Sequence, residues 1–152
     1  MRCTRTLREK PRKAGDLHVS QLMIFQRQGC KPLLNPSTKQ LALELSRTKS
    51  SFASLTAENG SFVQVAGGPG LFAIEYRDSS GKHFRGFQEK PVACHPDGTL
   101  LQTSAGSISM ARVDWFLIGQ VSETFASFLH SVPWPSNLHW RALNEQFQKI
   151  AG

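Results

Sequence analysis

The fold is decided by residues 51–87, which read SFASLTAENGSFVQVAGGPGLFAIEYRDSSGKHFRGF. Runs rich in aromatic and β-branched residues alternate there with short segments of glycine, asparagine, aspartate and proline, a pattern typical of strands joined by tight turns. Asn59-Gly60 predicts a type I′ hairpin turn, because both residues tolerate positive φ. The stretch therefore predicts an antiparallel meander with strands at residues 51–56, 61–65, 71–77 and 82–87.

On either side of the meander the sequence predicts a helix. Ser37 is a candidate N-cap for a helix that extends to about Lys49 and carries Leu41 and Leu45 on its apolar stripe. A second helix is expected between residues 114 and 131, beginning after Gly119, because a glycine inside a helix costs about 1 kcal/mol. Its expected apolar face consists of Leu117, Val121, Phe125, Phe128 and Leu129.

The remaining segments are expected to be short. We expect a first strand at residues 18–25, edge strands at 99–103 and 107–110, an extended segment at 137–140 and a last turn at 143–150. Together these elements predict an α+β fold, an antiparallel β-meander of four to six strands with two helices packed on one face.

The positive charge of the chain is unevenly distributed. The 152 residues carry a formal net charge of +7, and residues 1–49 hold eleven of the eighteen lysines and arginines. Residues 1–16 are basic and poor in apolar side chains, so we expect a disordered tail that is dispensable for folding. A single α+β domain is expected at residues 17–152.

Residue types that could carry chemistry are not grouped in the sequence. Cys3, Cys30 and Cys94 are widely spaced, and no pair of cysteines or cysteine–histidine cluster has the spacing of a zinc site. No histidine has a recognisable partner for acid–base catalysis. We therefore expect no metal, no cofactor and no enzymatic activity. The lack of a secretory leader or a membrane-length apolar run predicts a cytoplasmic protein without a membrane partner.

Several segments in order resemble one bacterial family. They are Asn35-Pro36-Ser37, residues 58–68 (ENGSFVQVAGG), residues 72–77 (FAIEYR), Lys82-His83-Phe84, residues 125–129 (FASFL) and Trp140. The combination is similar to small immunity-type proteins encoded beside polymorphic toxins and contact-dependent inhibition systems. The resemblance implies a binding protein that neutralises a toxin domain by protein–protein contact, and it implies no catalytic residues. Because the body of this chain is nearly neutral rather than acidic, a nuclease is a poor candidate for the target.

A partner-binding surface is expected on the face of the meander that the helices leave open. Residues two apart on a strand share a face, so His83 and Arg85 should point away from the helices and Phe84 toward them. The expected site residues are Tyr76, Arg77, Lys82, His83 and Arg85, with Trp134 as a further anchor. An Arg85–Glu75 contact is expected if the register allows it. Arg85→Glu is expected to weaken binding with little change in melting temperature.

The alternative function is nucleic-acid binding. Sheet platforms that stack bases interleave basic and aromatic residues on neighbouring strands, and Arg77, Lys82 and Arg85 lie among aromatic residues in this way. The basic tail could add affinity through counterion release. A toxin gene in the genomic neighbourhood favours the first function, and binding that weakens log-linearly with salt favours the second.

Overall fold

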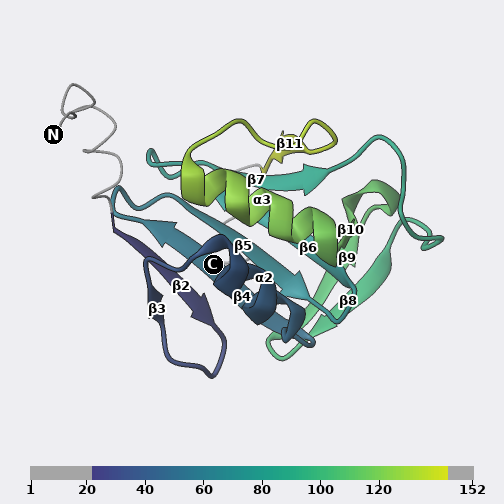
Figure 1. The fold of residues 1–152 in the computed structure, drawn as a ribbon. Helices are drawn as coiled ribbons and strands as arrows, with labels where there is room; N and C mark the ends of the chain where they lie inside the picture. The colour runs from purple at the N-terminus through teal and green to yellow at the C-terminus, as the bar shows by residue number, and fades with distance from the viewer. Residues whose placement is uncertain (1–21, 144–152) are drawn as a thin grey trace, which may run out of the picture.

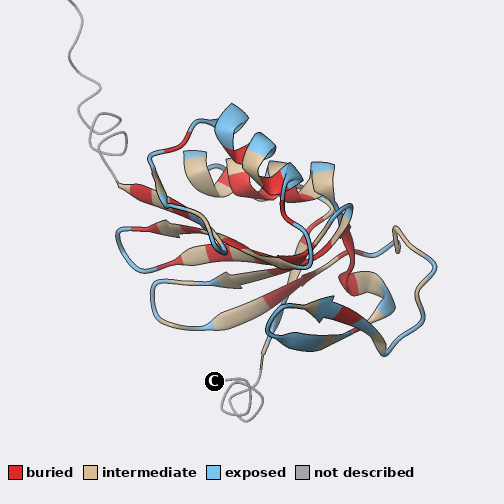
Figure 2. Cartoon of the chain, turned by 90° about the horizontal axis from the view of Figure 1, so that it is seen from below, coloured by how far each residue is buried: buried red, intermediate tan, exposed pale blue. Residues whose placement is uncertain are grey.

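The structure is a computed structural model that describes residues 22–143. An antiparallel sheet carries two helices on one face and a separate β-hairpin against the other, as Figures 1 and 2 show from two directions. The strands of the sheet are β2 (Met23–Arg27), β3 (Leu33–Leu34), β4 (Ser51–Ala57), β5 (Phe62–Gly67), β6 (Leu71–Arg77), β7 (His83–Phe87), β10 (Phe116–Leu117) and β11 (His139–Ala142). Their order is β11-β7-β6-β5-β4-β2-β3, and β10 pairs with β6.

The expected α+β class is confirmed, as is the meander of consecutive hairpins from β4 to β7. The sheet has more strands than expected because short segments join it, notably the two-residue strands β3, at its edge, and β10, which pairs with the start of β6. The basic tail at residues 1–16, the start of the strand expected at 18–25 and residues 144–150 of the expected last turn lie outside the described residues. The expected domain boundaries at 17 and 152 lie outside them as well.

The turn between β4 and β5 differs from the expected type. Gly60 N donates to Ala57 O at 3.0 Å, and Ala57 N donates to Ser61 O at 2.9 Å. Gly60 has φ +91°, whereas Asn59 is not among the residues with positive φ. This is a type I turn followed by a glycine bulge, so the type I′ prediction is wrong. The physical reason is the Asn59 side chain, whose Oδ1 accepts from Ser61 N at 2.9 Å and stabilises the longer turn.

The two helices are α2 (Thr38–Ser46) and α3 (Ile118–His130). Ser37 is confirmed as the N-cap of α2, because its side chain accepts from Gln40 N while Gln40 Oε1 accepts from Ser37 N. The expected start of α3 after Gly119 is wrong. The helix begins at Ile118, directly after β10, which places Gly119 in the first turn, and Gln120 Oε1 accepts from Leu117 N at 2.9 Å.

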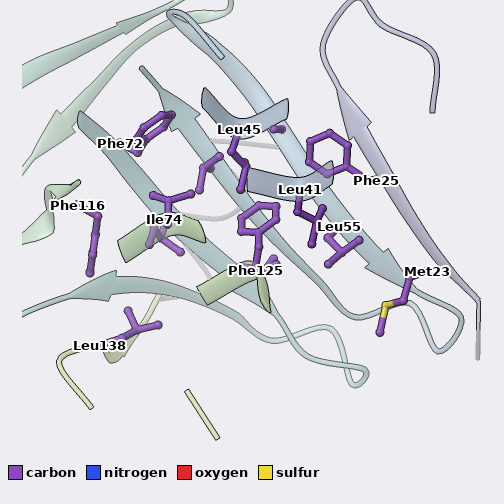
Figure 3. Packing of buried hydrophobic residues seen from close by; sticks show 14 of the residues in the cluster. Met23, Phe25, Leu41, Leu45, Leu55, Phe72, Ile74, Phe116, Phe125 and Leu138 are labelled. Atoms are coloured by element: carbon purple, nitrogen blue, oxygen red, sulfur yellow. The ribbon is translucent and has the colours of Figure 1, made fainter. Parts of the chain in front are cut away.

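The main core lies between the helices and the sheet (Figure 3). Leu41 and Leu45 of α2 and Val121 and Phe125 of α3 are at most 1% exposed, and they pack onto the inward side chains of the strands. Figure 3 labels the larger members of this cluster, namely Met23, Phe25, Leu41, Leu45, Leu55, Phe72, Ile74, Phe116, Phe125 and Leu138. The prediction that Leu117 belongs to the apolar face of α3 is wrong, because Leu117 precedes the helix and is 44% exposed.

The segments expected to be edge strands form the separate hairpin. They are β8 (Thr99–Thr103) and β9 (Gly106–Met110), which pair only with each other among the described residues. The short helix η1 (Arg112–Asp114) follows. The hairpin packs against the sheet face opposite the helices through a second apolar cluster, which consists of Ala66, Ala73, Leu101, Met110 and Trp115. Part of the face that was expected to be free is therefore covered.

Candidate binding surface

The six residues expected to form one site lie in three places. Arg77, His83 and Arg85 point away from the helices, because each neighbours a strand residue that packs on the helix side. We call this side of the sheet the open face; it comprises the outward residues of β2, β4, β5, β6, β7 and β11. Tyr76 and Trp134 belong instead to the helix side, and Lys82 is exposed in the turn between β6 and β7. The prediction of a single surface is therefore wrong.

Tyr76 and Trp134 take part in a cluster of aromatic rings on the helix side. Tyr76 stacks on Phe84 at 5.9 Å between centroids, and it contacts Trp134 at 5.2 Å and Trp140 at 5.4 Å. Trp134 also stacks on Phe128 of α3 at 6.2 Å. Rings at these distances are in direct contact and stabilise one another. Phe84 therefore points toward the helices as expected, and the cluster closes one end of the core.

Burial in this cluster changes the acidity of the phenol. The pKa of Tyr76 is raised from its usual 10.0, mainly because burial penalises the phenolate and secondarily because the Asp78 carboxylate lies nearby. Asp78 itself is in the β6–β7 turn, where its Oδ1 accepts from Ser80 Oγ at 2.7 Å and from Lys82 N at 3.0 Å. These hydrogen bonds, that of Ser80 first, lower the pKa of Asp78 below its usual 3.8. The turn holds Lys82 at the end of the sheet.

Six polar side chains lie in register across the open face, one from each of its strands. They are Gln26 (β2), Ser54 (β4), Gln64 (β5), Glu75 (β6), Arg85 (β7) and Arg141 (β11). We call them the polar row. Because neighbours in register have their Cβ atoms about 5 Å apart, the row forms a continuous stripe of hydrogen-bonding groups across the sheet.

Arg85 lies between Glu75 and Arg141 in the polar row but is not free. Its Nη2 donates to Glu75 Oε2 at 2.8 Å, so the expected Arg85–Glu75 contact is confirmed. Its Nη1 reaches Ser109 O of the hairpin at 3.5 Å, and its Nε is buried without a hydrogen-bond partner. Arg85 is only 7% exposed. The expectation that it could be reversed to glutamate at little cost is therefore contradicted by its surroundings.

Arg141 is the arginine that the sequence prediction missed. It is in register with Arg85, its guanidinium carbon lies 5.5 Å from the centroid of the Phe87 ring, and its Nη2 contacts both carboxylate oxygens of Asp114 at 2.8 and 2.9 Å. The side chain of Arg141 is 43% exposed, whereas that of Asp114 is 2% exposed. The pair thus presents one partly open guanidinium held on an aromatic ring.

Aromatic and imidazole rings lie on both sides of the polar row. On one side Phe62 of β5 meets His83 of β7 edge to face at 6.3 Å, across Arg77 of the strand between them. On the other side Phe87 and His139 lie 5.4 Å apart. Phe62, His83, Phe87 and His139 are all half-buried. The alternation of residues along each strand indicates which rings share the open face. It does not predict the pairing of β11 with β7, which brings His139 beside Phe87.

Two larger hollows lie away from this surface. One of about 240 Å³ is at the end of the helix-side aromatic cluster and is lined in part by Met23, Ala57, Phe128 and Trp134. The other, of about 470 Å³, is an open depression lined by residues 91–94, Pro96 and Arg112, where Cys94 is exposed. Within residues 22–143, no three His, Cys, Asp or Glu side chains are close enough together to hold a metal ion.

Comparison with known proteins adds no assignment. A scan of the sequence against protein-family models finds no match, and a search of curated proteins finds none either. The resemblance to immunity-type proteins therefore stays a prediction. No helix in the described part of the chain has the length and apolar character needed to cross a membrane.

Proposed function

We propose that this chain is a non-enzymatic, immunity-like binding protein that acts in the cytoplasm and neutralises a toxin domain by contact through the open face. The observation that carries the proposal is the composition of that face. A polar row with charge-paired arginines lies between half-buried aromatic and imidazole rings, all on a sheet surface opposite the helices.

Such a face suits a protein partner because it combines rings that a partner can bury with polar groups that it can hydrogen-bond. Aromatic rings and arginines are enriched where partners bury surface, and the few residues that dominate affinity come mostly from these types. The polar row adds donors and acceptors in a fixed register, since each member is held on a strand of a continuous ladder. A partner can therefore bury the rings while it hydrogen-bonds to the exposed members of the row, Gln26 and Arg141.

The same face is poorly suited to a nucleic-acid backbone. Affinity for phosphates comes from cations that release counterions on binding. Arg85 is already paired with Glu75, and Arg141 is already paired with Asp114. Among the described residues, Arg77 is the one arginine of the face without a carboxylate within 4.0 Å. This charge pairing favours the protein partner over the sheet-platform alternative.

The experiment uses the products of the genes that flank this one. Each is expressed with and without this chain, and growth identifies a toxic domain whose effect the chain relieves. Calorimetry with the purified toxic domain then gives its Kd for the chain. We expect binding that changes little between about 50 and 200 mM salt, unlike the log-linear weakening typical of phosphate contacts.

Variants on two surfaces locate the interface. Phe62→Ala removes a half-buried ring from the open face, and we expect it to weaken binding by about tenfold or more, as is typical of aromatic anchors. Leu43→Ala is the matched control, because Leu43 is 51% exposed on α2 on the other side of the sheet. Equal Kd values for Phe62→Ala and the unchanged chain, or a loss only with Leu43→Ala, would contradict the proposal.

A further inference from the structure

The positive charge of the described chain is concentrated at one edge of the fold. Residues 22–49 form β2, β3 and α2, which lie together at the β3 end of the sheet (Figure 1). They contain five lysines and arginines and one acid, Glu44, whereas residues 50–143 contain six lysines and arginines and seven acids. The fold thus converts a charge bias along the sequence into a charged edge, which we call the β2–β3–α2 edge.

Glu44, the single acid within residues 22–49, is engaged by two arginines, and Glu58 of the neighbouring β4–β5 turn accepts from Leu22 N at 3.4 Å. Arg27 Nε donates to Glu44 Oε1 at 3.0 Å, and Arg47 Nη1 donates to Glu44 Oε2 at 3.4 Å. Lys31, Lys39 and Lys49 are exposed and have no carboxylate within 4.0 Å among residues 22–143. We call these three the edge lysines. One is in the β2–β3 loop, one is in the first turn of α2 and one follows the end of that helix.

The chain that enters this edge is also basic. Residues 1–21 contain six lysines and arginines and two acids, and they join the described structure at Leu22, next to the start of β2. One arm of the test therefore removes most of these residues, so that their charge is separated from that of the edge lysines.

The residues of the edge favour phosphates over other anionic surfaces. Exposed lysines bind phosphates as point charges, and a strand of nucleic acid offers several phosphates in a row. The only aromatic residue in residues 22–49 is Phe25, which is 1% exposed, so the edge has no ring on which a base could stack. The edge exposes two large apolar side chains, Leu34 of β3 and Leu43 of α2, which is little apolar surface for insertion into a lipid headgroup layer.

We propose that the β2–β3–α2 edge binds the phosphate backbone of nucleic acid without reading base sequence. This surface is separate from the open face, so it is a second binding activity and does not depend on the toxin partner. It also moves the nucleic-acid contact away from Arg77, Lys82 and Arg85, where the sequence alone placed it.

The test measures binding of the full chain to labelled oligonucleotides by fluorescence anisotropy. The probes are an oligothymidylate and a duplex, each about 20 nucleotides long, between about 50 and 200 mM salt. A triple variant, Lys31→Gln with Lys39→Gln and Lys49→Gln, removes the edge lysines. We expect the slope of log K against log salt to become shallower by about 2 for the single strand and by about 3 for the duplex.

A matched triple variant controls for the change in net charge. Lys82→Gln with Lys90→Gln and Arg112→Gln also removes three exposed cations, but from residues 50–143. We expect its slope and Kd to equal those of the unchanged chain. Circular dichroism checks that both triple variants keep the same melting temperature, as expected for exposed substitutions.

Further arms separate the edge from the preceding residues and from other anions. A chain that lacks residues 1–16 should bind more weakly but still lose affinity when the edge lysines are removed. An unchanged slope in the edge-lysine variant, or an equal loss in the control variant, would overturn the proposal. So would tighter binding to phosphatidylserine vesicles than to the oligonucleotides, or a strong preference between two duplexes of different sequence.

Discussion

The helix-covered face and the open face are built from the same strands but are closed in different ways. On the helix side, residues such as Leu55, Val63 and Ile74 are 0% exposed under two helices. On the open face, the corresponding neighbours form the polar row and its flanking rings, and within residues 22–143 the β8–β9 hairpin, η1 and Trp115 cover part of them. Apolar burial stabilises the fold on the helix side, whereas polar side chains and half-buried rings lie on the other side, where we propose that a partner binds.

The largest expected effect compares one phenylalanine from each face. Phe125 of α3 is 0% exposed in the main core, so Phe125→Ala should lower the free energy of unfolding by about 3–5 kcal/mol. Phe62 is half-buried on the open face, so Phe62→Ala should cost about 1 kcal/mol or less. Urea denaturation of both variants measures the difference. Similar losses in the free energy of unfolding for the two variants would mean that the open face is packed as tightly as the helix side.

The next effect concerns the buried ion pair in the polar row. Arg85 is more deeply buried than Glu75, with side-chain exposures of 8% and 28%. Glu75→Leu leaves a buried cation without a partner and should cost about 2–4 kcal/mol. Arg85→Met leaves a carboxylate that water can reach, so it should cost less, about 1–2 kcal/mol. Chemical denaturation that gave the opposite order would show that the arginine is rehydrated when its partner is lost.

The burial of the aromatic cluster on the helix side can be measured through the pKa of the Tyr76 phenol. Tyr76 is the single tyrosine of the chain, so an absorbance titration at alkaline pH reports it alone. Its pKa should lie above 10.0 in the folded protein and return to that value in denaturant. Because the raised pKa favours the neutral phenol, its contribution to stability is complete below pH 10.0 and is lost as the pH rises through the folded pKa. A titration that matched the denatured protein would place Tyr76 in solvent.

The smallest effect concerns the turn that presents Lys82. Because the pKa of Asp78 is lowered in the folded state, its carboxylate stabilises the protein above pH 3.8, and this contribution is lost as the pH falls through the folded pKa. Asp78→Ala should therefore lower the melting temperature at neutral pH. In strong acid the melting temperatures of the variant and the unchanged chain should approach each other. Melting curves between neutral pH and strong acid test this. A difference in melting temperature that does not change with pH would assign the effect to turn geometry alone.

Much of the fold was predictable because it depends on local signals. Alternating residues and turn glycines located β4 to β7, and Ser37 marked the start of α2. The register of β11 on β7 and the docking of the β8–β9 hairpin depend on contacts between residues far apart in sequence, so no local pattern indicated them. The start of α3 was missed because the tolerance of the first turn for Gly119 was underestimated.

The site was predicted less well, for two different reasons. Tyr76 and Arg77 are adjacent on a strand and so point to opposite faces; the alternation that correctly placed Phe84 could have separated them. The burial of Arg85 could not be inferred, because it results from the hairpin that follows it in the sequence. Trp134 lies in an irregular segment after α3, where alternation gives no information.

The most direct test of the account is a pair of charge reversals measured against the toxic domain by calorimetry. Arg77→Glu changes an exposed arginine of the open face, and Arg47→Glu changes an exposed arginine beyond α2. If the open face binds the partner, Arg77→Glu should raise Kd by about tenfold or more while Arg47→Glu leaves it within about twofold. A larger effect of Arg47→Glu, or equal Kd values for both variants and the unchanged chain, would contradict the account.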